Sequence, residues 1–218
     1  MNNLITRIIT SVFLILILFL GLFYSKFLWL FLLILASSII YIEFNKIIKK
    51  IWKEKIVNIY FFGLISLIYL ICFIYISYDL STNTDFILIV LLVCIFSDIG
   101  GYVVGKIIGG KRLTKISPNK TVSGSFGSFI FAFIPIFFAT YSHQIEININ
   151  FINLFWLCLF ISFINQAGDI FISYFKRKAN VKDTGTILPG HGGLLDRIDG
   201  IIFAVPAAYL INIIFLNL

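Results

Sequence analysis

Long runs of apolar residues, separated by short charged loops, dominate this chain of 218 residues. A helix needs a run of about 20 mostly apolar residues to cross the hydrocarbon core of a bilayer. Seven stretches meet this condition, with predicted boundaries at 8–24, 27–43, 56–77, 85–105, 125–142, 149–172 and 198–217. The pattern therefore predicts an all-α polytopic membrane protein, built as a bundle of about seven transmembrane helices.

The composition excludes the water-soluble classes. The chain is 60% hydrophobic and 12% charged, with a mean hydropathy of +1.04, whereas soluble domains rarely exceed about half apolar residues. The apolar run after Arg7 is not followed by a small-residue cleavage site, so we expect a first transmembrane helix rather than a signal peptide. Cys72, Cys94 and Cys158 lie in apolar runs, and their spacing predicts neither a zinc site nor a redox pair.

Lysine and arginine are confined to alternate loops. If seven spans alternate, sixteen of the seventeen basic residues fall on one side and only Lys26 on the other. Positively charged loops face the cytoplasm, which predicts a cytoplasmic N-terminus and a C-terminus outside. The net charge of +7 thus serves orientation and anionic ligands, and no nucleic acid is expected as a partner. We divide the chain into N-terminal spans (1–80) and a catalytic transmembrane domain (81–218) with cytoplasmic loops 106–124 and 173–197.

The most polar segment is 173–199, with five basic residues, three carboxylates, a histidine and four glycines. On a continuous helix, Asp169, Ser173, Lys176 and Arg177 fall at i, i+4, i+7 and i+8. One face would then present a carboxylate, a hydroxyl and two phosphate-binding cations. The alternative, a basic flank that only sets orientation, leaves a carboxylate at a membrane helix end unexplained.

Two further aspartates follow this segment's glycines. Asp196 and Asp199 lie at i, i+3 and face the same way on a helix. Their charges repel unless a cation bridges them, and Mg²⁺ prefers oxygen ligands. We therefore expect Asp169, Asp196 and Asp199 to bind Mg²⁺, with a second cation left open. An ion pair between Arg197 and one aspartate is the structural alternative.

The loop between these groups contains Lys182, Asp183 and a glycine-rich run around His191. Glycine backbone can approach a phosphate closely and direct several N–H groups at it. His191 could be a general acid, a ligand of a phosphate oxygen or an ordinary loop histidine, and the residues alone leave the three open.

The loop 106–124 has a similar character. Asp98 ends the span before it, and Ser117, Lys120 and Thr121 are natural phosphate or nucleotide contacts. The glycines that follow, Gly124 and Gly127, equally suit helix packing.

Segment 173–199 resembles the signature of the phosphatidate cytidylyltransferases (CDP-diacylglycerol synthases). It fits S-x-hydrophobic-K-R-x4-K-D-x-G-x2-hydrophobic-P-x-H-G-G-hydrophobic-x-D-R-hydrophobic-D at every fixed position. Gly168-Asp169 and Ser117-Pro118-Asn119-Lys120-Thr121 resemble that family too. The likeness covers about the C-terminal 120 residues, and the first three spans are generic. The chain departs from the family at Val122-Ser123, where a Trp-Glu pair is usual, and at Ile172, where a Glu often precedes the Ser.

The resemblance implies transfer of a cytidylyl group from CTP to phosphatidic acid, forming CDP-diacylglycerol and pyrophosphate for phospholipid biosynthesis. It further implies a bacterial-type inner (plasma) membrane, an active site facing the cytoplasm, contacts with membrane lipids, and a homodimer. The expected catalytic residues are Asp169, Lys182, Asp183, His191, Asp196 and Arg197. The expected substrate-binding residues are Asp98, Ser117, Lys120, Thr121, Ser173, Lys176 and Arg177. A CTP-dependent lipid kinase and, in a different class, a membrane transporter remain the alternatives.

Overall fold

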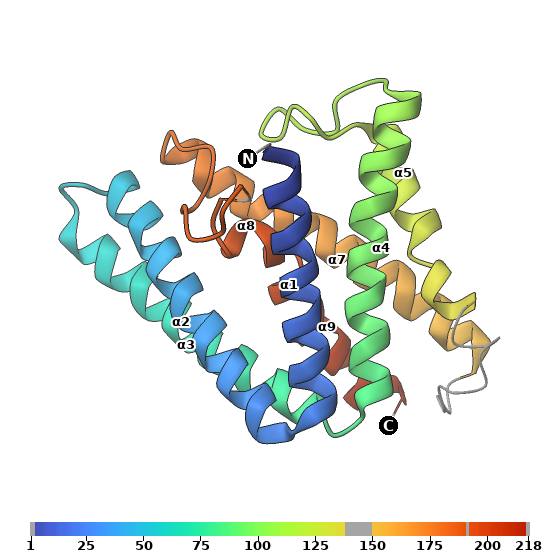
Figure 1. Ribbon diagram of the computed structural model, residues 1–218. Helices are drawn as coiled ribbons and strands as arrows, with labels where there is room; N and C mark the ends of the chain where they lie inside the picture. The colour runs from blue at the N-terminus through green and yellow to red at the C-terminus, as the bar shows by residue number, and fades with distance from the viewer. Residues whose placement is uncertain (1–2, 138–149, 191, 217–218) are drawn as a thin grey trace. The chain divides into compact units, whose positions relative to one another are not determined.

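The computed structural model describes residues 3–137, 150–190 and 192–216, and these residues form helices joined by loops, without a β-strand in those ranges (Figure 1). The elements are α1 (Asn3–Tyr24), α2 (Lys26–Ile51), α3 (Ile56–Leu80), α4 (Thr84–Ile108), α5 (Val122–Phe131), α7 (Phe151–Lys178), α8 (Leu195–Ile198), α9 (Ile201–Ile211) and a π-helix η1 (Asn212–Leu216). The predicted all-α class is confirmed for the described chain.

Four of these helices, α2, α3, α4 and α7, are long and apolar enough to cross a membrane. Large apolar side chains stand exposed on them, including Phe27 and Val57 at 82% and 79% exposure. Apolar surface of this extent is unfavourable in water and is suited to lipid. The chain is therefore a membrane protein. Three more apolar helices, Ile9–Tyr24, Val122–Phe137 and Ile201–Ile214, are shorter, so the count of seven spans stays a prediction.

The chain forms two compact units, each built from two separate segments. The first consists of Met1–Thr82 and Phe175–Ile198, and the second of Asn83–Tyr174 and Asp199–Leu218. The predicted division at residue 80 is not tested by these units, because it concerned function rather than packing.

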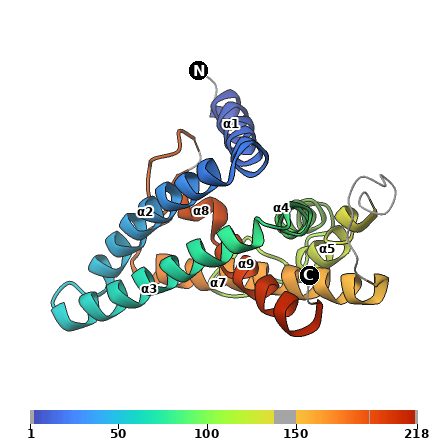
Figure 2. The same ribbon diagram turned by 90° about the horizontal axis from the view of Figure 1, so that it is seen from below.

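In the first unit, α2 and α3 lie side by side as an antiparallel hairpin (Figures 1 and 2). Ser25 begins α2, because its Oγ accepts a hydrogen bond from the N–H of Leu28 at 3.1 Å. Near the start of α2, Trp29 donates its indole N–H to the carbonyl of Ser77 on α3 at 3.1 Å. The hairpin is thus fixed at this end by a buried polar contact.

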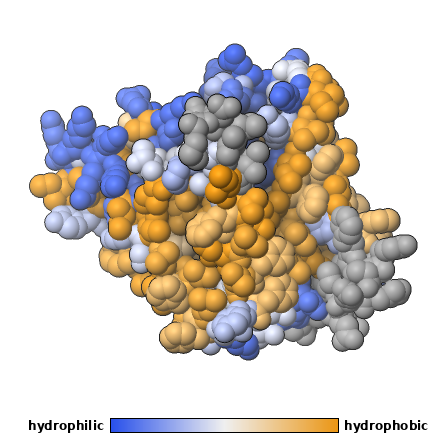
Figure 3. All heavy atoms as spheres, in the orientation of Figure 1, coloured by the Kyte–Doolittle hydropathy of each residue, from blue (hydrophilic) through white to orange (hydrophobic). Residues whose placement is uncertain are grey.

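The other end of the hairpin holds the end of α7 in an apolar cluster. Phe175 packs with the buried Ile47 and Ile48, and its ring meets that of Phe44 edge-on at 5.4 Å. Hydrophilic residues gather at this end of the hairpin, whereas apolar residues cover its length (Figure 3). The cluster places the residues that follow Phe175 beside α2.

In the second unit, α4 and α5 pack closely (Figures 1 and 2). A Cβ on Gly100 would lie 2.5 Å from the carbonyl oxygen of Gly127, and one on Gly124 would lie 2.7 Å from that of Gly101. These glycines allow the two backbones to touch, as small residues do between membrane helices. Helix packing therefore accounts for Gly124 and Gly127.

A second close approach joins α7 to the start of α9. A Cβ on Gly168 would lie 3.0 Å from the carbonyl oxygen of Asp199, and Gly200 lies directly against Asn165. The rings of Phe171 and Phe203 meet edge-on at 5.5 Å beside this contact. The Gly-Asp pair of α7 is thus held next to the beginning of α9.

Candidate active site

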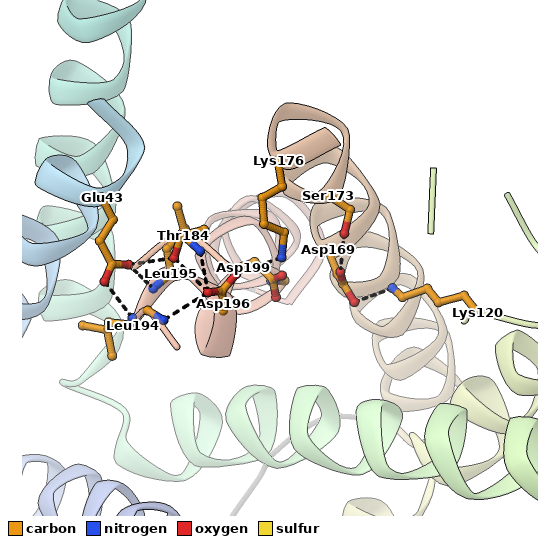
Figure 4. A network of polar contacts seen from close by, with 12 residues as sticks. Glu43, Lys120, Asp169, Ser173, Lys176, Thr184, Leu194, Leu195, Asp196 and Asp199 are labelled. Atoms are coloured by element: carbon orange, nitrogen blue, oxygen red, sulfur yellow. Dashed lines mark hydrogen bonds and ion pairs between the residues drawn. The ribbon is translucent and has the colours of Figure 1, made fainter. Parts of the chain in front are cut away.

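Asp196 is the centre of a polar cluster in the first unit (Figure 4). Its Oδ2 accepts three hydrogen bonds, from the N–H of Thr184 at 2.7 Å, the hydroxyl of Thr184 at 3.0 Å and the N–H of Gly193 at 3.1 Å. Its Oδ1 pairs with the ammonium group of Lys176 at 2.9 Å. The carboxylate side chain is only 6% exposed, so these donors take the place of water.

The surroundings of Asp196 favour its charged form. Burial by itself would raise the pKa of this carboxyl, but the hydrogen bond from Lys176, the N–H groups of Thr184 and Gly193, and the charge on Lys176 together lower the pKa below its ordinary value. Asp196 is therefore a carboxylate at neutral pH.

The glycine-rich run before Asp196 turns back on itself. Leu188 and Gly192 exchange two backbone hydrogen bonds, at 2.9 and 3.2 Å. Gly190 and Gly192 have φ of 76° and 86°, which side chains other than glycine rarely adopt. A Cβ on Gly192 would also lie 3.1 Å from Oδ2 of Asp196. The turn therefore requires glycine where it approaches the carboxylate.

A residue without a role in the sequence analysis completes this cluster. Glu43, on α2, is fully buried, and it accepts hydrogen bonds from the hydroxyl of Thr184 at 3.0 Å and the N–H groups of Leu194 and Leu195 at 3.1 and 2.8 Å. The signal was present, because Glu43 is the one acidic residue in the apolar stretch 26–51, and such a carboxylate indicates a functional site. Treating the first three spans as generic hid it.

The second unit contains a separate cluster around Asp169 (Figure 4). Its carboxylate forms an ion pair with Lys120, and the hydroxyl of Ser173 donates to it at 3.3 Å. About a quarter of each charged side chain is exposed, 27% for Lys120 and 28% for Asp169. The structure thus brings together three of the predicted site residues, from the loop before α5 and from α7.

Polar contacts between helices surround this ion pair. Asn165 on α7 donates to the carboxylate of Asp98 on α4 at 2.8 Å. The hydroxyl of Ser125 on α5 donates to the side-chain carbonyl of Gln166 at 2.6 Å. Asn165 and Gln166 had no predicted role, and they connect α7 to both neighbouring helices.

The loop before α5 is ordered by its own side chains. The carbonyl of Ser117 accepts from the N–H of Lys120 at 3.1 Å, and the hydroxyl of Thr121 caps α5 by accepting from the N–H of Gly124 at 3.0 Å. Ser123, at a position where the family differs, lies 3.0 Å from the Thr121 hydroxyl and donates to the carbonyl of Gly109. The departure at Ser123 therefore contributes to the loop's structure.

The remaining predicted site residues include four exposed charged side chains. The side chains of Arg177, Lys182, Asp183 and Arg197 are exposed. Asp199 accepts a hydrogen bond from the N–H of Gly200 at 2.9 Å. His191 lies outside the described residues, so its three readings stay open.

Carboxylate oxygens of this kind fit a Mg²⁺ ion chemically. Within 3–137, 150–190 and 192–216, no three histidine, cysteine, aspartate or glutamate side chains are grouped as metal ligands. The assignment of Asp169, Asp196 and Asp199 to Mg²⁺ stays a prediction.

Comparison with known proteins adds an independent finding. The model of the "Cytidylyltransferase family" matches residues 49–215. Proteins named phosphatidate cytidylyltransferase match from Staphylococcus haemolyticus (38% identical over 160 residues, 72% of this chain and 59% of that protein), Rickettsia bellii (43% over 140 residues, 59% and 59%) and Bacillus subtilis (42% over 121 residues, 55% and 44%). The chain therefore spans less than two thirds of the length of these curated relatives.

Proposed function

Because the chain belongs to the cytidylyltransferase family, we propose that it transfers a cytidylyl group from CTP to phosphatidic acid. The products are CDP-diacylglycerol and pyrophosphate, which supply phospholipid biosynthesis. The relatives' shared name, phosphatidate cytidylyltransferase, supports the choice of lipid substrate.

One observation carries the proposal. Each unit holds a carboxylate paired with a lysine, Asp196 with Lys176 and Asp169 with Lys120, and all four residues lie in segments that resemble the family signature. A magnesium–nucleotide complex needs both kinds of group, since carboxylates bind the cation and ammonium groups bind phosphate oxygens. In the free protein the pairs neutralise each other, and binding the complex would exchange these partners.

The geometry of Asp196 indicates which atom would take part. Its Oδ2 already accepts three hydrogen bonds from Thr184 and Gly193, whereas its Oδ1 accepts one from the ammonium group of Lys176. A cation would therefore compete with Lys176 for Oδ1, and the displaced ammonium group would turn to a phosphate oxygen.

The reaction places modest demands on acid–base chemistry. An oxygen of the phosphatidic acid phosphate attacks the α-phosphorus of CTP, and the bond from that phosphorus to the bridging oxygen of the β-phosphate breaks. The attacking phosphate is already anionic, so positioning and charge neutralisation are the main requirements. Mg²⁺, held by Asp169, Asp196 and Asp199, would supply positive charge to the triphosphate. In our proposal, His191 assists the leaving pyrophosphate and Asp183 holds a cation or orients lysines. Lys182, Arg177 and Arg197 bind phosphate.

The membrane arrangement follows from the same premises. We infer seven spans, with the three short apolar helices completing the four long ones, a cytoplasmic N-terminus and a C-terminus outside. The basic loops then face the cytoplasm, where CTP is present, in an inner (plasma) membrane. Phosphatidic acid would enter from the bilayer, and the protein would act as a homodimer.

Turnover by the purified protein in detergent tests the proposal. The protein is supplied with CTP, phosphatidic acid and Mg²⁺, and both pyrophosphate and the lipid product are followed. We expect pyrophosphate release that requires phosphatidic acid and yields CDP-diacylglycerol. Release of CDP with a phosphorylated lipid would move the assignment to a kinase, and no turnover from folded protein with any phospholipid would overturn it.

A further inference from the structure

Glu43 is a fully buried carboxylate on α2, a helix that is long and apolar enough to cross a membrane. No lysine or arginine of the described chain lies within ion-pair distance of it. Instead, both of its oxygens accept hydrogen bonds from neutral donors, two backbone N–H groups and one hydroxyl. A buried carboxylate is costly unless such bonds satisfy it, so its presence calls for a reason.

All of these donors belong to one segment, 184–195. Oε1 accepts from the N–H of Leu194, and Oε2 accepts from the N–H of Leu195 and from the hydroxyl of Thr184. Figure 4 shows the Glu43 side chain directed from α2 at this segment. A single side chain therefore ties both ends of the glycine-rich loop, which are distant from it in sequence.

Two glycines of the loop make room for this carboxylate. A Cβ on Gly185 would lie 2.5 Å from Oε1 of Glu43, and a Cβ on Gly193 would lie 2.6 Å from Oε2 and closer still to the hydroxyl oxygen of Thr184. Real Cβ atoms do not approach other atoms so closely. The segment is thus shaped around Glu43, independently of the hydrogen bonds.

The same segment also positions the side chain of Asp196. The N–H groups of Thr184 and Gly193 donate to Oδ2 of Asp196, and the hydroxyl of Thr184 lies 3.0 Å from both Glu43 and Asp196. Because a hydroxyl has one proton, it donates to only one of the two carboxylates at a time. Thr184 therefore connects the two acidic side chains.

We propose that Glu43 is a positioning residue for Asp196. By fixing Thr184, Leu194 and Leu195, it keeps Oδ2 of Asp196 in its hydrogen bonds and leaves Oδ1 directed at Lys176. Glu43 lies outside the matched range 49–215, so family membership does not assign it this role. The catalytic consequence rests on the proposed cytidylyl transfer, whereas the structural consequence does not.

The test compares Glu43→Gln with Glu54→Gln, which makes the same chemical change at an exposed position of the α2–α3 loop. In Glu43→Gln, the new amide NH₂ must face the N–H of Leu194 or that of Leu195, so at least one hydrogen bond is lost in either orientation. We expect amide hydrogen exchange in peptides covering 184–195 to rise by roughly 10- to 100-fold without substrate. The control variant should exchange like the parent protein.

Turnover provides the second readout. We expect Glu43→Gln to lower kcat by roughly 10- to 100-fold with KM for CTP within about threefold, because the loss concerns the placing of Asp196 rather than the affinity for nucleotide. Thr184→Val should have a similar effect, whereas Thr184→Ser should retain most turnover. The double variant with Glu43→Gln and Thr184→Val should lose less kcat than the product of the two separate losses.

The outcomes separate the two proposals. Unchanged exchange in 184–195, or fully multiplicative effects on kcat, would overturn the role of Glu43. A general rise in exchange over all helices would also overturn it, since Glu43 would then only stabilise the fold. If the parent protein lacks cytidylyl transfer while exchange responds as expected, the proposed function fails and the positioning of the segment stands.

Discussion

Replacing Asp196 with asparagine tests the site most directly. The substitution preserves shape and removes the charge. Asparagine can keep its carbonyl oxygen at the position of Oδ2, where three donors from Thr184 and Gly193 converge. Its NH₂ group must then face the ammonium group of Lys176. The opposite orientation would lose the hydrogen bonds of Thr184 and Gly193, so we expect the first orientation.

The magnitude follows from what is lost. The bond between Lys176 and Asp196 is 2.9 Å long, and the two side chains are 13% and 6% exposed. A hydrogen bond to a charged group contributes about 1.5–3 kcal/mol, and the lysine loses its partner, so we expect the folded protein to lose about 2 kcal/mol. The effect on turnover should be larger, about 100-fold or more in kcat, since removing one charge-stabilising group from an active site costs about that much.

The assay measures thermal unfolding and pyrophosphate release for the same detergent preparations. Asp79→Asn, at the far end of α3 from the Glu43 cluster, serves as the matched control, because it removes a carboxylate that has no place in the proposed site. Turnover of Asp196→Asn above a tenth of the parent's, from folded protein, would refute the role of Asp196. Normal turnover with reduced stability would mean that Asp196 stabilises the fold through Lys176 and has no role in catalysis.

Three more predictions concern the rest of the structure. Lys120→Met and Asp169→Asn should be coupled in a double-mutant cycle by about 0.5–1 kcal/mol in stability, because the pair is partly exposed, and additive unfolding free energies would contradict the ion pair. Gly127→Ala should destabilise the protein by about 1–3 kcal/mol, since its Cβ would lie 2.7 Å from the carbonyl oxygen of Gly100; an unchanged melting temperature would contradict the close packing. The folded pKa of Asp196 is lowered, so its stabilising effect is present above the ordinary aspartate pKa and is lost as pH falls through the folded pKa. The difference in melting temperature between the parent and Asp196→Asn should therefore shrink in acid, and a difference that grows would contradict the sign.

The sequence predicted the apolar helices well and their ends less well. The run 27–43 became α2, which continues to Ile51, and the run 149–172 became α7, which continues to Lys178. Hydropathy marks the part of a helix that lies in hydrocarbon, whereas lysine-rich turns remain helical beyond it. The run 198–217 begins within the short helix α8, and after Gly200 it continues as α9 and then as the π-helix η1 up to Leu216.

The candidate site was predictable where its signals are local. Asp169 and Ser173 share a face of α7 at i, i+4, and they are joined in the structure. The pairing of Lys120 with Asp169 required two segments to be treated as one site, which the family resemblance suggested. Glu43 could not be paired with Leu194 and Leu195 from the sequence, because about 150 residues separate them and no periodic pattern reports such a contact.

The glycines of segment 173–199 are required for different physical reasons, which the motif alone does not reveal. A glycine-rich run near basic residues suggested backbone that approaches a phosphate. In the structure, Gly190 and Gly192 are required by their positive φ. Gly185 is required by the space that Glu43 occupies, whereas Gly193 is crowded by both Thr184 and Glu43. Alanine at 190 or 192 would strain the backbone, but the strain of alanine at 185 would be relieved by shortening the side chain at 43. Combining Gly185→Ala with Glu43→Ala should therefore cost less stability than the sum of the two changes, and simple additivity would show that the space is set by something other than Glu43.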